Sequence, residues 1–294
     1  MADLEVRLLL EAIFDRYHYD FRAYAMASLK RRLVQACDRL GVGTLSGLQE
    51  RLLHEPESFS VLLQYLTVQV SDMFRDPEFF LALRAQVLPT LATYPSIKVW
   101  CAGCSTGEEA YSLAILLHEE GLLDRSIIYA TDINAQALRE ASAGIYPLAR
   151  LRGFTENHRR SGAQTSLSDY YHAVSSAVTP GAASAAHSAG ASRGPSGDSA
   201  IFDQTLRRRI TFSDHSLATD HVFSEVHLIT CRNVLIYFDH TLQSRALRLF
   251  AEALVSRGFL GLGSKESLRF TPAAEFFTEF SMPERIYRKN GDRM

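Results

Sequence analysis

The sequence predicts an α/β protein in which a doubly wound, mostly parallel sheet follows an all-α N-terminal domain. From Ile97 onward, short apolar runs alternate with amphipathic helical stretches, the order that places helices on both faces of a parallel sheet. Up to about residue 88, helical periodicity continues without any strand pattern. We therefore expect two domains, residues 1–88 and residues 89–294.

The N-terminal domain is expected to consist of amphipathic helices. Gly41 and Gly43 mark the end of the second one, since glycine readily terminates a helix. The first expected stretch is Leu4–Ile13, with Leu4, Leu8, Leu9 and Ile13 on its apolar face. The other expected stretches are Phe21–Leu40, Thr44–His54, Ser58–Thr67 and Pro77–Leu88.

The second domain alternates between buried strands and helices. The expected strands are Ile97–Cys101, Ser126–Thr131, Val226–Cys231, Gly258–Gly263 and Arg285–Lys289. The expected helices begin at Glu108, Asn134 and Thr241. A parallel sheet of this kind binds its ligand at the carboxyl ends of the strands, so the residues that follow each strand are the candidate site.

One segment interrupts the alternation. Thr179–Ser199 is almost entirely Ala, Ser, Gly and Pro, a composition that buries too little surface to offset the cost of ordering. Its flanks, Asp169–Val174 and Ala200–Phe202, both have strand character. We expect a small antiparallel β subdomain at about residues 165–212 that carries a flexible insertion at 179–199.

Composition narrows the function classes. The 294 residues carry a formal net charge of -2, so no overall field favours nucleic acid or a membrane surface. The N-terminus lacks a charged-then-apolar leader, and no apolar run approaches the roughly 20 residues that span a bilayer. We therefore expect a cytoplasmic protein. We also expect a monomer, because the helical domain can cover the ligand-binding rim of the sheet unaided.

The four cysteines do not form a disulfide framework in a chain of this length. Cys101 and Cys104 have the spacing of a redox or zinc pair, but the chain has no second such pair. Both positions also flank the glycine turn described next. We therefore expect no metal.

The stretch Gly103–Gly107 joins the first strand to a helix in the manner of a cofactor cradle. Glycines allow close approach of the backbone, and free N–H groups of the first helical turn face the ligand. The loop is not G-x-G-x-x-G, and Glu108 and Glu109 would repel a pyrophosphate. They could instead accept hydrogen bonds from an ammonium group, which S-adenosylmethionine has. The alternative is that both glutamates only cap the helix.

Polar residues follow two further strands. Asp132 lies where nucleotide-binding folds carry an acid for the ribose hydroxyls, although it could instead be a helix N-cap. Arg232 and Asn233 interrupt two apolar runs, so they must be satisfied in the site or turn to solvent. Tyr237 offers a phenol to the same rim, but a tyrosine taken alone is more often part of a core.

Three motifs together carry a family resemblance. Gly103–Ser112, Thr131–Ile133 and Cys231–Phe238 resemble the chemotaxis receptor methyltransferase family, CheR. The stretch Val68–Asp76 is similar to the segment that precedes the family's catalytic domain. The likeness extends in order from about Phe21 to Lys289, and it implies a Rossmann-like, S-adenosylmethionine-dependent methyltransferase sheet.

The resemblance implies a protein-glutamate O-methyltransferase that esterifies glutamates on the cytoplasmic helices of chemoreceptors and releases S-adenosylhomocysteine. It places Glu109 near the amino group of the cofactor and Asp132 at the ribose. It implies that Arg232 and Asn233 contact the cofactor. Arg75 would reach into the site from the helical side, beside Tyr237, and these two are the catalytic candidates.

The resemblance implies further cofactor contacts at Gly103, Gln69, Ser71, Arg75, Ser216 and Leu217. The family often has asparagine at the position of Gln69, threonine at that of Ser71 and asparagine at that of Ser216. These replacements stay polar. The expected insertion falls in the subdomain that grips a receptor's tethering peptide in some members, which puts use of a tether in doubt.

The second helix is locally basic, with Lys30, Arg31, Arg32 and Arg39. Arg32 and Arg39 are two turns apart and share a face. Such a run is usually a solvated helix surface, but against an acidic receptor bundle it would be a steering patch. We expect these four residues to bind the receptor.

Two other classes of function stay open. One is a methyltransferase for nucleic acid or a small molecule, which is disfavoured because the chain lacks an Asn/Asp-Pro-Pro-aromatic loop and a basic charge. The other is a non-catalytic module that binds cofactor or receptor in signalling. The full set of candidate site residues weighs against that alternative.

Overall fold

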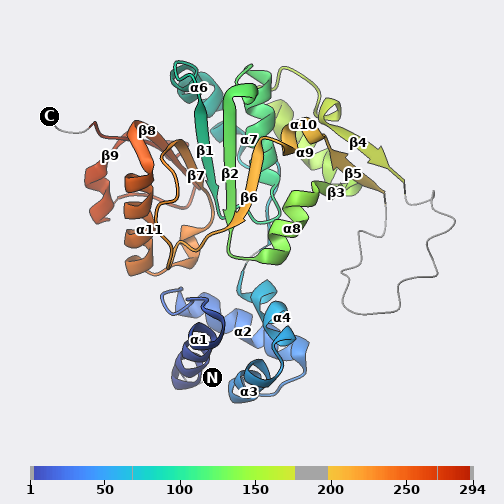
Figure 1. Cartoon of the computed structure of the whole chain (residues 1–294), viewed down its shortest axis with the longest axis vertical. Helices are drawn as coiled ribbons and strands as arrows, with labels where there is room; N and C mark the ends of the chain where they lie inside the picture. Colours follow the sequence, from blue (N-terminus) through green and yellow to red (C-terminus); the bar gives the residue numbers. More distant parts are fainter. Residues whose placement is uncertain (1–2, 68, 176–197, 270, 292–294) are drawn as a thin grey trace.

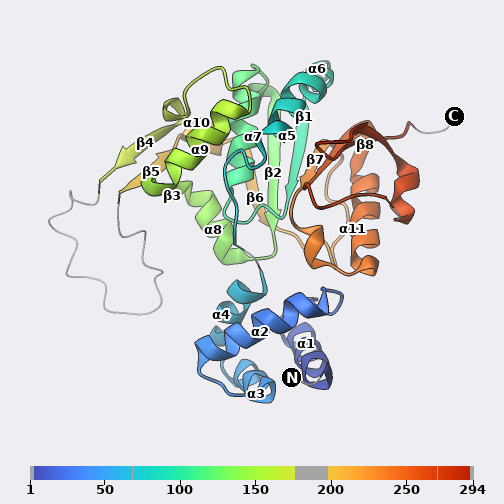
Figure 2. The same ribbon diagram turned by 180° about the vertical axis from the view of Figure 1, so that it is seen from behind.

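The computed structural model describes residues 3–67, 69–175, 198–269 and 271–291. A four-helix N-terminal domain lies against one end of a larger α/β domain (Figures 1 and 2). The helices of the small domain are α1 (Asp3–Tyr17), α2 (Met26–Leu40), α3 (Leu45–His54) and α4 (Glu57–Leu66). They share a hydrophobic core of their own, as the helical periodicity predicts.

Two details of the N-terminal domain differ from expectation. Leu4 and Leu8 are exposed, and α1 instead buries the face formed by Val6, Leu9, Leu10 and Ile13. The second helix begins at Met26 rather than Phe21. The residues just before it leave the helical path because Tyr24 forms a β-bridge with Phe238 in the other domain.

The described residues form a seven-stranded sheet with the strand order β6-β2-β1-β7-β8-β10-β9. Its strands are β1 (Ile97–Ala102), β2 (Ser126–Asp132), β6 (Ile210–Asp214), β7 (Val226–Cys231), β8 (Leu254–Leu262), β9 (Phe277–Ser281) and β10 (Ile286–Lys289). The first five strands in the spatial order are parallel, and β10 is antiparallel to both β8 and β9. The predicted α/β class and the mostly parallel sheet are confirmed.

Each face of the sheet buries a separate hydrophobic core. Val99 and Cys101 of β1 belong to the core beneath α7 (Glu108–Glu119) and α9 (Leu148–Arg160). Trp100, which points the other way in a pleated strand, belongs to the core beneath α11 (His240–Ala253). The near-continuous apolar strands are therefore explained by burial on both faces.

The helical stretch expected at Pro77–Leu88 is α5 (Pro77–Ala82), a π-helical turn (Leu83–Val87) and α6 (Leu88–Leu91). It packs in the sheet's core rather than in the N-terminal core, through side chains that include Phe79, Phe80 and Leu83. The chain thus passes from the N-terminal core to the core of the sheet before Phe74, well ahead of the expected domain boundary at residue 88. Helical periodicity alone could not show which core these helices join.

A second, three-stranded antiparallel sheet has the order β3-β5-β4. Its strands are β3 (Ile145–Pro147), β4 (Tyr171–Val174) and β5 (Ser199–Phe202). The expected subdomain at 165–212 therefore lacked β3 and wrongly included the start of β6, which belongs to the large sheet. Ser199 is the first residue of β5, and residues 179–197 of the expected insertion lie outside the described part of the chain.

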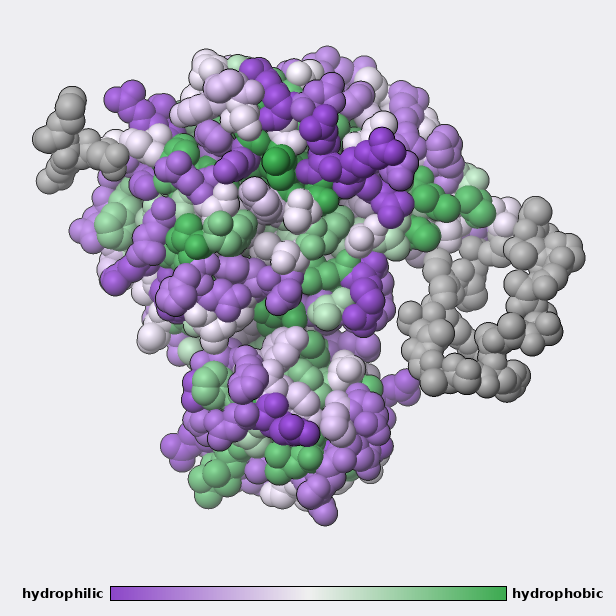
Figure 3. Space-filling model, viewed as in Figure 1, coloured by the Kyte–Doolittle hydropathy of each residue, from purple (hydrophilic) through white to green (hydrophobic). Residues whose placement is uncertain are grey.

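The remaining elements are α8 (Ala135–Ala143), α10 (Gln204–Arg207) and the 3-10 turns Leu123–Arg125, Leu167–Tyr170, Leu235–Tyr237 and Pro272–Phe276. Helix α9 was not expected, because only Leu151, Phe154 and His158 of its thirteen residues are buried. Among the described residues no helix is long and apolar enough to cross a membrane. On the face shown in Figure 3, apolar and polar residues are interspersed over both domains.

A buried ionic cluster ties α7 to α9 on the side of the sheet away from α11. The Glu119 side chain is fully buried and accepts from Arg84 Nη2 at 2.5 Å, His158 Nε2 at 3.2 Å and Thr165 Oγ1 at 2.6 Å. Burial alone would raise the pKa of Glu119, but these hydrogen bonds outweigh it and lower the pKa to about 2.

Replacing Glu119 with Gln should reduce the free energy of unfolding near neutral pH by about 2 kcal/mol, since the charged hydrogen bonds are lost. A lowered pKa stabilises the fold above the ordinary value of 4.5, and that contribution disappears as the pH falls toward about 2. The wild type and the variant should therefore converge in urea denaturation below pH 4.5. A constant difference across this range would contradict the assignment; Glu50→Gln on the exposed face of α3 is the control.

Candidate functional site

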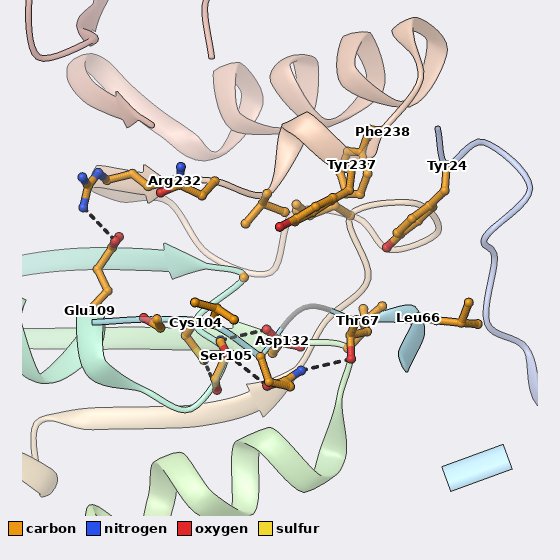
Figure 4. Close-up of a pocket in the computed structure, with 18 of the residues that line it drawn as sticks. Tyr24, Leu66, Thr67, Cys104, Ser105, Glu109, Asp132, Arg232, Tyr237 and Phe238 are labelled. Carbon is orange, nitrogen blue, oxygen red and sulfur yellow. Dashed lines mark hydrogen bonds and ion pairs between the residues drawn. The ribbon is translucent and has the colours of Figure 1, made fainter. Parts of the chain in front are cut away.

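A cavity of ≈ 360 Å³ opens where β1, β2 and β7 end, and residues of both domains line it. Strand β1 has β2 on one side and β7, a much later strand, on the other. This reversal of strand order is where doubly wound sheets bind their ligands. In Figure 4, Glu109 and Arg232 lie at one end of the cavity, and Tyr24 and Leu66 lie toward the other.

The glycine loop after β1 is shaped by two close approaches. Gly103 has φ +74°, and a Cβ there would lie 2.4 Å from Val234 Cγ2. Gly107 has φ +91°, and a Cβ would lie 2.8 Å from the Cβ of Ala141. Both positions therefore require glycine. Gly103 lines the cavity, as expected of a cofactor loop.

The two glutamates that begin α7 have separate environments. Glu109 lines the cavity, and its Oε2 accepts from Arg232 Nη1 at 3.1 Å. Glu108 turns away from the cavity and is fully buried against Arg150 and Thr106. Only Glu109 is thus available to a ligand, and the expectation that both carboxylates face it is wrong for Glu108.

Asp132 lines the cavity and lies between Glu109 and Thr67 in Figure 4. Its carboxylate accepts from the backbone N–H of Ser105 at 2.8 Å and of Asn134 at 2.9 Å. Burial raises the pKa of Asp132, and these two hydrogen bonds oppose the rise. The cap of α8 is Asn134, whose side chain accepts from Gln136 N and Ala137 N, so the alternative that Asp132 is the N-cap is excluded.

Arg232 is a buried connector rather than a free side chain. Its Nη1 bonds Glu109, and its Nη2 donates to Asp76 Oδ2 at 2.7 Å and to the Arg75 carbonyl at 2.9 Å. The guanidinium lies over the Phe79 ring at 4.2 Å. The sequence left two alternatives for the Arg232 side chain, the site or solvent, and the structure places it in the site. There Arg232 fixes the direction of Glu109.

The loop after β7 is held by a residue that the sequence did not single out. Glu266 is buried, and its carboxylate accepts from the backbone N–H of Asn233, Val234, Ile236 and Gly263 at 2.7–3.3 Å. Asn233, which lines the cavity, has φ +61°. One carboxylate thus sets the strained turn that brings Asn233 and Tyr237 to the cavity. A lone buried glutamate gives no pattern in sequence.

The segment between the domains supplies four cavity residues, Gln69, Val70, Ser71 and Arg75. Gln69 Oε1 accepts from Ser105 Oγ at 3.0 Å, which joins this segment to the glycine loop. In the described part of the chain, no hydrogen bond or ion pair occupies the Arg75 guanidinium. Arg75 is therefore a half-buried cation available to a ligand.

Ser216 and Leu217 are both expected to contact the cofactor, but they lie in different pockets. Leu217 lines the cavity, together with His215. Ser216 lies instead in an adjoining pocket with Tyr19 and Asp20, and its N–H donates to Asp220 Oδ2 at 2.9 Å. The backbone turn that this bond closes directs Ser216 away from the main cavity.

The expected basic surface of α2 is wrong for Arg32, which is buried and lines the cavity. Its Nη1 donates to the Leu66 carbonyl at 2.5 Å, and its guanidinium lies over the Tyr237 ring at 4.4 Å. Burial lowers the pKa of this guanidinium, so an anion beside it would be stabilising. Arg31 and Arg39 are exposed as expected, while Lys30 pairs with Asp3.

The N-terminal domain is fastened over the cavity by backbone pairing. Ala25 N donates to the Tyr237 carbonyl at 2.8 Å, and Asp239 N donates to the Ala23 carbonyl at 2.9 Å. The rings of Tyr24 and Phe238 meet edge to face at 5.0 Å between centroids. Tyr237 is therefore placed beside Arg32 by the same contact that closes the site.

The cysteines beneath the loop are unpaired and buried. Burial raises the pKa values of Cys101, Cys104 and Cys231 well above the ordinary value of a thiol, so these thiols stay protonated at neutral pH. Within the described residues, no group of three or more His, Cys, Asp or Glu side chains is arranged to hold a metal.

Two family descriptions match the chain. "CheR methyltransferase, all-alpha domain" matches residues 4–67, and "CheR methyltransferase, SAM binding domain" matches residues 69–180 and 186–284. The junction at residues 67–69 agrees with the early change of core described above.

Several known proteins are similar over most of the chain. Cher3 of Pseudomonas putida is 53% identical over 98% of this chain and 98% of its own length. The chemotaxis protein methyltransferase of Listeria monocytogenes is 28% identical over 85% of this chain and 84% of its own length. That of Vibrio parahaemolyticus is 32% identical over 69% of this chain and 66% of its own length.

Replacing Glu266 with Ala should loosen the turn before Tyr237, because four backbone donors lose their acceptor and each unmet buried donor costs about 1–3 kcal/mol. Amide hydrogen exchange at Val234 and Gly263 should accelerate by at least about tenfold. The neighbouring exposed Lys265→Ala is the matched control. Unchanged exchange in Glu266→Ala would show that water or another group replaces the carboxylate.

Proposed function

Because the chain belongs to the CheR methyltransferase family, we propose that it transfers the methyl group of S-adenosylmethionine to glutamate side chains of chemoreceptors. The acceptors would lie in the cytoplasmic helical region, and the products are a glutamate methyl ester and S-adenosylhomocysteine. The observation that carries this proposal is that one cavity brings acidic groups together with cationic and phenolic ones. Glu109 and Asp132 supply its acidic groups, while Arg32, Arg75 and Tyr237 supply cationic and phenolic groups.

The residues present fit S-adenosylmethionine. The cavity of ≈ 360 Å³ falls in the range of about 300–1,000 Å³ that small-molecule sites occupy. Glu109 would accept from the ammonium group, and the free lone pairs of Asp132 would accept from the ribose hydroxyls. Ile133 and Leu217 provide apolar lining for the adenine. Gly103 lines the same cavity, and its lack of a Cβ leaves room for the neighbouring Val234 side chain.

The cofactor supplies a methyl group on a positively charged sulfur, which a carboxylate oxygen can displace. An ionised glutamate is already a nucleophile, so the protein needs no general base. The protein's contribution is orientation, which is worth several kcal/mol of barrier. Arg75, whose guanidinium has no partner among the described residues, would attract the carboxylate, and Tyr237 would steady it.

Arg32, in the N-terminal domain, is a third residue that would bind the substrate carboxylate, beside Arg75 and Tyr237. Its Nη2 is buried and has no hydrogen-bond partner in the described part of the chain. A buried, incompletely bonded guanidinium is costly until an anion approaches, so a substrate carboxylate would find it already desolvated. Arg31 and Arg39, on the exposed face of α2, would instead act at a distance on an acidic receptor surface.

The decisive experiment is transfer of a labelled methyl group from S-adenosylmethionine to receptor cytoplasmic fragments, with base-labile release of methanol. Base-labile label on the receptor would support carboxyl methylation. Stable label would point to a different acceptor atom. Cofactor binding by calorimetry without transfer to several fragments would favour a non-catalytic module and overturn the proposal.

Replacing Arg75 with Ala should lower kcat by about 100-fold or more, because a charge that orients the reacting carboxylate is lost. Affinity for S-adenosylhomocysteine should change by less than about threefold, since Glu109 and Asp132 are untouched. Arg248→Ala, an exposed arginine on α11, is the control. A large loss of cofactor affinity would move Arg75 to the cofactor side of the site.

Arg32 and Arg39 should differ in their dependence on salt. Arg39→Glu should slow methylation at low ionic strength, and the deficit should shrink as salt screens the exposed charge. Arg32→Ala should slow methylation about equally at every salt concentration, because its charge is buried in the cavity. Steady-state rates at low and high salt test this pair. A salt-sensitive Arg32 variant would return Arg32 to the receptor-steering surface.

A further inference from the structure

We propose that Arg150 is a positioning residue that holds the interdomain segment 69–76 over the cofactor cavity. Arg150 lies in the first turn of α9, and it is not among the residues that line the cavity. The inference rests on the proposed function, because it assigns Arg150 to the binding of the same cofactor.

The guanidinium of Arg150 bridges two parts of the site. Its Nη1 bonds Glu108 Oε1 at 2.6 Å, at the start of α7. Its Nη2 donates to the Ser71 carbonyl and to Asp72 Oδ1, the latter at 3.1 Å. The Phe154 ring lies 4.7 Å from the guanidinium carbon, which restricts its movement. Arg150 therefore joins the interdomain segment directly to the helix that carries Glu109.

The rest of the segment is fastened separately. Asn157 Nδ2 donates to the Met73 carbonyl at 3.1 Å, and Ser112 Oγ accepts from Phe74 N at 2.9 Å. Arg232 holds the carbonyl of Arg75 at 2.9 Å. At the Ser71 end, Arg150 is thus one of two fastenings, beside the bond from Ser105 Oγ to Gln69 Oε1 at 3.0 Å, while the Arg75 end has fastenings of its own.

Charge burial makes the bridge costly to break. The Glu108 side chain is fully buried, and burial raises its pKa, opposed by its hydrogen bond from Thr106 and by the charge of Arg150. Without Arg150, the one side-chain donor left to this carboxylate among the described residues is Thr106 Oγ1, at 2.7 Å. An unpaired buried carboxylate either protonates or draws in water, and either change disturbs the start of α7.

Loss of Arg150 should affect the cavity residues at one end of the segment 69–76. Ser71 and Gln69 line the cavity at the end that Arg150 fixes, and Arg75 lines it at the end that Arg232 fixes. Loss of Arg150 should therefore weaken cofactor binding and spare the orientation of Arg75. A general loss of folding would instead lower the active fraction and leave KM unchanged.

The test compares Arg150→Ala with Arg152→Ala, an exposed arginine on the same helix. In Arg150→Ala, the KM for S-adenosylmethionine and the Kd for S-adenosylhomocysteine should rise by about tenfold, the loss expected for one charged hydrogen bond. The kcat at saturating cofactor should fall by less than about threefold. Amide exchange at Asp72 should accelerate even without cofactor. Arg152→Ala should match the wild type in all four.

Two further variants separate charge from geometry. Arg150→Lys keeps the positive charge near Glu108, but an ammonium cannot reproduce the fork that reaches Ser71 at the same time. Arg150→Lys should therefore regain the thermal stability that Arg150→Ala loses, but it should keep most of the rise in KM. Arg150→Ala combined with Glu108→Gln removes the unpaired charge and should recover stability in the same way, without restoring KM.

The possible results are distinguishable. If KM and amide exchange in Arg150→Ala match those in Arg152→Ala, the positioning role is wrong. If KM returns to the wild-type value in the double variant, the unpaired charge rather than the fastening caused the defect, and the role is again wrong. If the folded wild type binds no S-adenosylhomocysteine, the proposed function fails, while the exchange at Asp72 still decides whether Arg150 holds the segment.

Discussion

The buried guanidinium of Arg232 is the interaction on which the rest of the site depends. It arises at the end of β7, contacts Glu109 at the start of α7 and binds both Asp76 and the Arg75 carbonyl in the interdomain segment. Three parts of the chain that are distant in sequence therefore share one cation. Because a buried cation must be paired, the two carboxylates are fixed in direction as well as in place.

The site is also a product of the contact between domains. Each domain has its own core, and the backbone pairing of residues 23–25 with residues 237–239 joins them beside the cavity. That pairing places Arg32 over the Tyr237 ring. A helical domain that could have served only to recognise a partner therefore also supplies part of the cavity wall (Figure 4).

The carboxylates in and around the cavity have two different roles. Asp132 and Glu109 can still accept hydrogen bonds from a ligand, whereas the carboxylates of Glu108 and Glu266 bind other groups of the protein. Glu266 shapes one loop, and Glu108 with Arg150 fastens the segment opposite. Glu109 and Asp132 are thus the acidic groups that a ligand can meet, while Glu266 and, through Arg150, Glu108 hold the backbone around them.

The sequence by itself determined the α/β class, the glycine loop and the positions of Glu109 and Asp132, because strand periodicity and the residues after a parallel strand are local signals. Tertiary structure alone decided that Glu108 and Ser216 turn away, that Arg32 turns inward and that the helices after Pro77 join the sheet's core. Each of these depends on what lies opposite the residue, and the partners Arg150, Asp220 and Tyr237 are 42, 4 and 205 residues away along the chain. Even the near contact requires a particular backbone turn, so no local pattern in the sequence encodes it.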